Sequence, residues 1–202
     1  ALEQSGLLAG VVGTVPPEPG LIAFADACAR AAACSPDAVV GLGGGSVLDV
    51  AKLIAALAGT GRSPEGYFGN GLLPGRRCRL VCVPTTSGTG SEVSPNAILL
   101  DERDRLKKGV ISPWLVPDAA FVDPALTLSV PPAVTAYTGL DALTHCLEAF
   151  ANRRAHVCVD LIASEGIRLI SSNLVRSVTQ GEDLDARSAV ALGSLYGGLC
   201  LG

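Results

Sequence analysis

Residues 39–46 of this chain read VVGLGGGS, an apolar run that leads into three consecutive glycines and a serine. The apolar part fits a buried parallel strand over residues 38–42, and the glycines fit a tight turn before a helix. Such a turn offers backbone N–H groups and the positive end of a helix dipole to a diphosphate. Ser46 replaces the third glycine of the G-x-G-x-x-G fingerprint, and a purely structural turn would look the same, so both interpretations stay open.

The helix after this turn is expected to begin at Ser46, which would serve as its N-cap. Asp49 lies three residues further on and resembles the acidic member of a capping box. The helix is expected to run to about Ala58 and to end with Gly59 in the C′ position.

Outward from the turn, strands alternate with helices and loops. We expect a loop over residues 1–20, a helix over 21–33, strands over 79–83, 97–100 and 119–122, a loop over 61–75 and a charged hairpin tip over 101–108. After two consecutive prolines the pattern changes, and residues 133–151, 158–174 and 184–201 are expected to be helices. The chain therefore predicts an α/β domain with a mainly parallel sheet over residues 1–130, followed by a helical part over 131–202, with the boundary near Val130.

Composition excludes several classes of protein. Hydrophobic residues make up 49% and charged residues 17% of the 202 residues, which is typical of a core-rich globular chain. The net charge of -4 argues against nucleic acid as a partner. No apolar run reaches the roughly 18 residues of a membrane span, and no signal-peptide pattern is present.

The seven cysteines are odd in number and form no C-x-x-C pair. This usage is typical of small buried hydrophobic residues in a reducing cytoplasm. The chain contains no Met and stops in an apolar, glycine-rich stretch over residues 195–202, so we expect both ends to be cut from a longer chain.

A second glycine-containing stretch follows the strand over residues 79–83. Residues 84–92 read PTTSGTGSE, and we call residues 85–94 the hydroxyl loop. Ligands of open α/β sheets bind at the carboxyl ends of strands, where this loop begins. The hydroxyls of Thr85, Thr86, Thr89 and Ser91 could contact phosphate, ribose or nicotinamide. Alternatively, they satisfy backbone groups of a solvated loop.

Asp141 and His145 lie one helical turn apart in the first expected helix of the second part. Positions i and i+4 share one helix face, so a carboxylate oxygen and an imidazole nitrogen can reach one Fe²⁺ or Zn²⁺ ion. The alternative is a hydrogen-bonding role without metal. The other histidine, His156, is expected on the surface between two helices.

The glycine turn, the hydroxyl loop and the Asp/His pair, in this order, resemble the iron-dependent (group III) alcohol dehydrogenase family. The matching stretches are GGGS-x-x-D-x-A-K over residues 43–52, PTTSGTGSEV over 84–93, PD at 117–118, DP-x-LT over 123–127 and TGLDALTH over 138–145. The resemblance extends from about Asp37 to the end of the chain. It implies a dehydroquinate synthase-like architecture, in which a dinucleotide-binding domain precedes an all-helical metal-binding domain.

The same resemblance implies the site. The cofactor-binding residues that it implies are Gly44, Gly45, Ser46, Asp49, Thr85, Thr86, Thr89, Ser91, Lys107 and Leu126. Asp141 and His145 match the first two metal ligands and are therefore the implied catalytic residues. The family's two further histidine ligands and its first strand lie outside this sequence, so the chain by itself is expected to be inactive.

The activity implied by the resemblance is hydride transfer between NAD(P) and an alcohol, aldehyde or ketone at a bound Fe²⁺, with Zn²⁺ as an alternative. The resemblance also implies a cytoplasmic homo-oligomer, such as a dimer, without nucleic-acid or membrane partners. Other members of the superfamily stay open as alternatives: a glycerol dehydrogenase, a dehydroquinate synthase, a maleylacetate reductase or a hydroxyacid–oxoacid transhydrogenase. A non-catalytic nucleotide-binding module is the alternative from another class.

Overall fold

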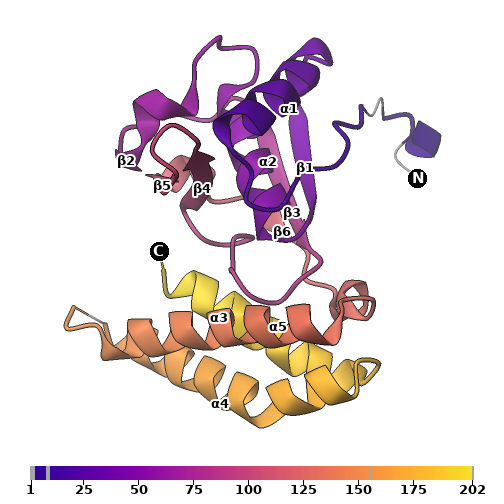
Figure 1. The fold of residues 1–202 in the computed structure, drawn as a ribbon, viewed down its shortest axis with the longest axis vertical. Coiled ribbons are helices and arrows are strands. Elements are labelled where there is room, and N and C mark those ends of the chain that lie inside the picture. Colours follow the sequence, from indigo (N-terminus) through magenta and orange to yellow (C-terminus); the bar gives the residue numbers. More distant parts are fainter. Residues whose placement is uncertain (1–2, 8–9, 155, 202) are drawn as a thin grey trace.

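The computed structural model describes residues 3–7, 10–154 and 156–201. An α/β part lies above three helices that are stacked against one another (Figure 1). Short 3-10 helices interrupt the loops at Glu3–Ser5, Pro64–Tyr67, Pro113–Leu115 and Pro124–Thr127. In the ranges that the structure describes, no helix combines the length and the apolar character needed to cross a membrane.

The first sheet is parallel and has the order β1-β3-β6. It contains β1 (Ala38–Gly43), β3 (Arg79–Pro84) and β6 (Ala119–Ala120). In the register of β1 and β3, Gly43 pairs with Pro84. The glycine turn and the hydroxyl loop therefore leave the sheet side by side, at the carboxyl edge where open α/β sheets bind ligands.

Helix α2 (Gly45–Leu57) is the centre of the α/β part. It contacts β1, β3, β4 and helix α1 (Leu21–Ala33), which explains why its residues are buried nearly all round. Leu48, Leu53 and Ala55 have no exposed surface.

The second sheet has the order β2-β5-β4 and contains β2 (Gly69–Asn70), β4 (Asn96–Asp101) and β5 (Leu106–Ile111). Strands β4 and β5 form an antiparallel hairpin, and β2 pairs with β5 in parallel. The strand over residues 97–100 is confirmed. The charged segment over 101–108 contains the hairpin tip, as expected, but also the start of β5, because the cross-strand ladder outweighs the weak strand propensity of its lysines.

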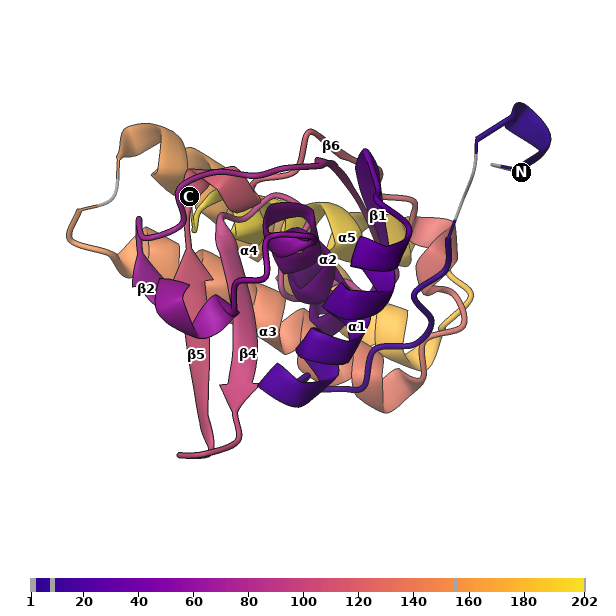
Figure 2. The same ribbon diagram turned by 90° about the horizontal axis from the view of Figure 1, so that it is seen from above.

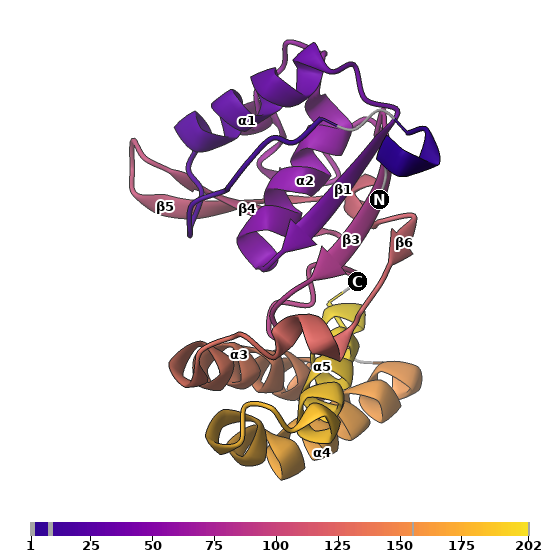
Figure 3. The ribbon, with the colours of Figure 1, turned by 90° about the vertical axis from the view of Figure 1, so that its right-hand side faces the viewer.

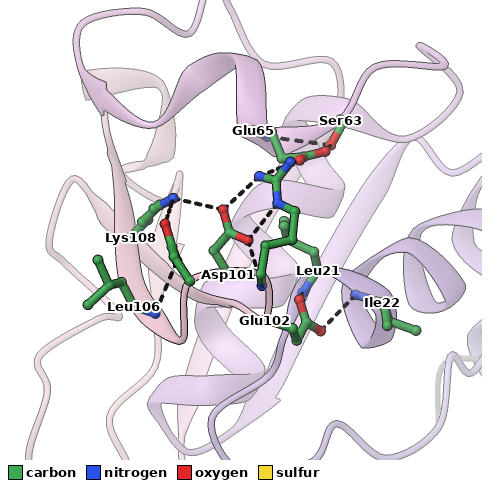
Figure 4. Close-up of polar contacts among 10 residues, drawn as sticks. Leu21, Ile22, Ser63, Glu65, Asp101, Glu102, Leu106 and Lys108 are labelled. Atoms are coloured by element: carbon green, nitrogen blue, oxygen red, sulfur yellow. Dashed lines mark hydrogen bonds and ion pairs between the residues drawn. The ribbon is translucent and has the colours of Figure 1, made fainter.

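The carboxylate of Asp101 binds side chains on both sides of the turn at the tip of this hairpin (Figure 4). Its side chain is fully buried and accepts a bond of 2.7 Å from Nη2 of Arg103 and one of 2.8 Å from Nζ of Lys108. These charge-assisted hydrogen bonds hold the pKa of Asp101 well below its usual value.

The next residue, Glu102, joins the hairpin to α1. Its carboxylate accepts hydrogen bonds from the backbone N–H groups of Leu21 at 3.1 Å and Ile22 at 3.2 Å, as Figure 4 shows. A negative charge at a helix N-terminus satisfies unpaired N–H groups and complements the helix dipole. The hairpin is therefore anchored to the first helix through side-chain capping.

The helical part contains α3 (Pro132–Ala151), α4 (Val157–Thr179) and α5 (Leu184–Leu199). The three helices pack on one another around a core that includes Cys146 and Ile170. Together with the mainly parallel sheet above them, they confirm the fold class expected from the sequence.

Three expectations about local structure were wrong. Residues 38–42 form the parallel strand but not a buried one, since Val40 and Leu42 are 52% and 60% exposed on the face away from α2. Helix α2 begins at Gly45 with Gly44 as its N-cap and no side-chain cap, so Ser46 is not the cap and Asp49 forms no capping box. The carboxylate of Asp49 is bound to partners from other segments instead.

The remaining differences concern bounds and exposure. The strand expected over 119–122 has only two residues, and α4 continues to residue 179. Gly59 has a φ of +72° directly after α2, as a C′ glycine should. All seven cysteines are free thiols. Cys78, Cys82 and Cys146 are buried, as expected of small hydrophobic residues, whereas Cys34 and Cys158 are exposed. His156 lies on the surface as expected and caps α4.

Candidate functional site

The glycine turn joins β1 to α2 and packs closely against the hydroxyl loop. The N–H of Thr85 donates to the carbonyl of Gly43 at 3.0 Å. A methyl group added at Gly44 would lie 3.2 Å from Oγ1 of Thr86, and one added at Gly45 would lie 2.6 Å from Cγ2 of Thr89. Glycine is therefore required for the loop to approach the start of the helix this closely.

The hydroxyl loop is held in place by Asp49. Oγ of Ser91 donates to Oδ1 of Asp49 at 2.6 Å, and the N–H of Ile98 donates to Oδ2 at 3.1 Å. Burial raises the pKa of Asp49, against the lowering effect of the Lys52 charge and of these two hydrogen bonds. Asp49 thus anchors the hydroxyl loop, and the strand that follows it, to α2 through its two carboxylate oxygens.

Lys52 is a second anchor, and the sequence reasoning missed it. Its side chain is completely buried. Its ammonium donates to the carbonyls of Ser94 and Asn96, both at 2.8 Å, and to Oγ of Ser94 at 3.3 Å. Burial lowers the pKa of Lys52, while the charges of Asp49 and its other neighbours raise it. The available signal was a lone lysine in the otherwise apolar helix sequence VAKLIAAL.

A cavity of about 440 Å³ opens beneath the glycine turn. Its wall contains most of the residues singled out from the sequence, and they come from both parts of the chain. Those residues are Gly45, Ser46, Asp49, Thr89, Ser91, Lys107, Asp141 and His145. The structure therefore brings the glycine turn and the Asp/His pair to one cavity, which sequence separation alone does not require.

Four expected site residues do not line this cavity. Gly44 and Thr86 lie directly behind its wall, against each other, and Thr85 is hydrogen-bonded to the glycine turn. Leu126 lies further away, in the 3-10 helix that packs on α5, and is 38% exposed.

The pair on α3 has a geometry that suits a shared cation. Nε2 of His145 lies 3.7 Å from Oδ1 of Asp141, and their side chains are 21% and 47% exposed. Two atoms that each bind one ion at about 2.1 Å are separated by roughly 3–4 Å, so the two residues fit a metal. Nδ1 of His145 is buried without a hydrogen-bond partner among the described residues, so the imidazole retains unused binding capacity.

The described ranges contain no cluster of three or more His, Cys, Asp or Glu residues that could enclose a metal ion. Asp141 and His145 could therefore supply two of the ligands that a bound metal ion would need, but not a complete set. Glu148 lies on the same cavity wall, two turns along α3 from Asp141.

The cavity wall also carries an ion pair that the sequence did not predict. Nζ of Lys107 lies 2.6 Å from Oε1 of Glu18, and both side chains are more than half exposed. Glu18 has a φ of +51°, a left-handed conformation that is uncommon for residues other than glycine. Lys107 is thus placed at the cavity as expected, with its charge partly compensated by Glu18.

A second cavity of about 330 Å³ lies between α1, the end of α2 and the loop that follows it. Its wall is formed largely by apolar side chains, such as Leu21, Phe24 and Leu57. None of the residues expected from the sequence to be functional lies there.

Comparison with known proteins adds independent findings. Residues 1–124 match the family model "Iron-containing alcohol dehydrogenase", and residues 135–202 match "Fe-containing alcohol dehydrogenase family, C-terminal". Long-chain-alcohol dehydrogenase 1 of Geobacillus thermodenitrificans (strain NG80-2) is 43% identical over 201 residues, which cover 98% of this chain and 50% of that protein.

Two solved structures are similar throughout the chain. A 1,3-propanediol oxidoreductase has a TM-score of 0.93 at 34% identity, covering 98% of this chain and 52% of that one. A sulfoacetaldehyde reductase from Bifidobacterium kashiwanohense in complex with NAD+ has a TM-score of 0.89 at 33% identity, covering 96% of this chain and 52% of that one. The chain thus spans about half the length of the relatives that it matches.

Proposed function

This chain belongs to the iron-containing alcohol dehydrogenase family, and from that premise we propose that the whole protein transfers hydride between NAD(P) and an alcohol, aldehyde or ketone. One observation carries the proposal: the glycine turn and the Asp141–His145 pair line the same cavity. A dinucleotide on the turn would extend its nicotinamide toward a substrate oxygen near the pair.

In this proposal the glycine turn binds the cofactor diphosphate. The first N–H groups of α2, at Gly45 and Ser46, have no partner within the helix and point outward from its positive end. The absence of a side chain at Gly45, which lines the cavity, lets phosphate oxygens approach the backbone. Lys107, on the wall of the same cavity, contributes a positive charge.

The hydroxyl loop orients the rest of the cofactor. Thr89 and Ser91 lie on the cavity wall, and the bond from Ser91 to Asp49 holds this wall in position. A wall that is ordered before the cofactor binds reduces the entropy cost of binding and fixes the nicotinamide.

Asp141 and His145 would hold the metal ion, together with further ligands that the described residues do not supply at this place. A divalent metal at this place supplies a Lewis acid that lowers the pKa of an alcohol substrate. The i, i+4 spacing on α3 places both side chains on the cavity wall, where a metal that they hold would meet the oxygen of a substrate in the cavity.

Several finer points are proposals of the same kind. The metal is Fe²⁺, with Zn²⁺ as an alternative, and the cofactor is NAD or NADP. The NAD+ complex of the sulfoacetaldehyde reductase supports a nicotinamide cofactor. Residues 1–130 would serve as the dinucleotide-binding domain and 131–202 as the start of the metal-binding domain, in a homodimer in the cytoplasm.

The test is metal content and turnover in the whole protein. Asp141→Ala should remove most of the bound metal in elemental analysis and abolish alcohol-dependent formation of NADH or NADPH. Thr144→Ala is the matched control, because Thr144 is exposed on the same helix and its hydroxyl donates to the carbonyl of Leu140, with no second side-chain bond among the residues that the structure describes. Unchanged metal in Asp141→Ala would refute the ligand assignment, and wild-type protein without dehydrogenase activity would refute the function.

A further inference from the structure

The hydroxyl loop lies between the α/β part and the helices, as Figures 1 and 3 show. The backbone of this loop lies directly against α5 at Gly90 and Gly198. A methyl group added at Gly198 would overlap the carbonyl oxygen of Gly90 and lie 2.7 Å from its Cα. One added at Gly90 would lie 2.6 Å from the nitrogen of Gly198. The two backbones therefore touch with no room for a side chain on either.

On the far side of α5, the neighbouring glycine touches the proposed metal ligand. A methyl group at Gly197 would lie 3.2 Å from Cβ of His145 and 3.3 Å from the carbonyl oxygen of Ala142. The end of α5 is thus enclosed between the hydroxyl loop and the ligand-bearing turn of α3.

The residues on either side of Gly90 in the loop contact the glycine turn and the helix that follows it. Thr89, which precedes Gly90, packs against Gly45, and Ser91, which follows it, is bonded to Asp49. A second contact between the same two parts lies close by, because a methyl group at Gly88 would be 2.9 Å from Cβ of Thr138 on α3.

We propose that Gly90 and Gly198 are positioning residues that set the separation between the proposed metal ligands and the proposed cofactor turn. The proposal rests on the proposed function for its catalytic consequence. A continuous series of close contacts leads from His145 through Gly197 and Gly198 to Gly90, and from there through Thr89 to Gly45.

Backbone atoms in such a series cannot be compressed or rotated away, as a flexible side chain can. Hydride transfer requires reacting atoms about 3–3.5 Å apart, and a displacement of about 1 Å can lower the rate about 100-fold. The size of two glycines therefore determines whether the cavity can bring cofactor and substrate into reacting distance.

The experiment compares Gly198→Ala with Gly193→Ala in the whole protein. Both exchange glycine for alanine within α5, so their effects on helix propensity are matched. The methyl group at Gly193 meets the side chain of Ile170 at 2.5 Å, inside the helical part. Of the two added methyl groups, only the one at Gly198 would overlap the hydroxyl loop.

Five measurements compare the variants with the wild-type protein. In a crystal structure of Gly198→Ala, the distance between Cα of Gly45 and Cα of His145 should increase. Its kcat should fall about tenfold or more, with the primary deuterium isotope effect on kcat increased, because hydride transfer becomes rate-limiting. Bound metal and the cofactor Kd should stay within about twofold of wild type, and Gly193→Ala should keep its kcat within the same margin.

An unchanged Gly45–His145 distance or an unchanged kcat in Gly198→Ala would overturn the proposal. An equal loss in Gly193→Ala, or a loss of activity explained by lost metal, would also overturn it. If Gly198→Ala does not fold, Gly88→Ala applies the same displacement at the second contact and is judged by the same criteria. If the wild-type protein has no dehydrogenase activity, the proposed function fails, and the Gly45–His145 distance alone decides whether the glycines set the spacing.

Discussion

Ser91 donates a hydrogen bond of 2.6 Å to Asp49, and this bond joins the hydroxyl loop to the helix that starts at the glycine turn. The partners are 42 residues apart in the chain. Without this bond, Oδ1 of Asp49 would lie at the wall of the cavity without its hydrogen-bond donor. The bond therefore contributes both to stability and to the position of the loop.

Ser91→Ala should lower the free energy of unfolding by roughly 1–3 kcal/mol, because it leaves a partly buried carboxylate oxygen without its donor. The cofactor Kd should rise as well, since the loop loses an anchor next to Thr89. Thermal unfolding and a fluorescence titration with reduced cofactor would measure the two effects. Ser87→Ala in the same loop is the control, because the structure shows no side-chain hydrogen bond for Ser87 among the described residues. Equal behaviour of the two variants would contradict the anchoring role.

Gly45→Ala should weaken cofactor binding about tenfold or more, which corresponds to about 1.4 kcal/mol. The added methyl group would lie 2.6 Å from Cγ2 and 2.8 Å from Oγ1 of Thr89, so it would displace that side chain and obstruct the backbone N–H groups. Titration of the cofactor into the whole protein measures the change. Gly75→Ala, where a methyl group meets nothing within 4 Å, should leave the Kd unaltered. A Kd that is unchanged in Gly45→Ala would argue against diphosphate binding at the turn.

Asp101→Asn should destabilise the protein at neutral pH and flatten its stability profile in acid. The pKa of Asp101 is depressed in the folded state by hydrogen bonds from Arg103 and Lys108. The unfolded chain therefore binds the proton more tightly, so this contribution is complete above the unfolded pKa and is lost as pH falls toward the folded one. The melting temperature between neutral pH and about pH 3 measures the effect, since an unperturbed Asp titrates near pH 3.9.

Asp26→Asn provides the comparison for this variant. Asp26 is an exposed carboxylate whose one ion-pair partner within the described ranges is the exposed Arg30 of the same helix. Exposed pairs of this kind contribute about 0–1 kcal/mol, so its profile should follow that of the wild type. Parallel profiles for Asp101→Asn and the wild type down to acid pH would show that the hairpin network has no such role.

Much of the site could be predicted because its chemistry is local. Three consecutive glycines between an apolar run and a helix determine a turn with accessible N–H groups, and a spacing of four residues places Asp141 and His145 on one face of a helix. Strands at residues 38 and 79 and the change to helices after residue 131 follow from periodicity in the same way.

The errors arose where partners come from distant segments. Asp49 has the spacing of a capping residue, but Ser91 and Ile98 bind its carboxylate. Lys52 is a single charge in an apolar helix, and only the packed loop provides carbonyls to satisfy it. The strand β5 exists because β4 pairs with it along its whole length.

The sequence by itself determined the glycine turn, the hydroxyl-rich loop and the Asp/His spacing, because each depends on backbone geometry within one or two turns of the chain. Only the tertiary structure decided that they face one cavity and how far apart they lie. That separation depends on contacts such as the one between Gly90 and Gly198, which lie 108 positions apart in the sequence. The two residues fit closely because whole helices pack against the loop.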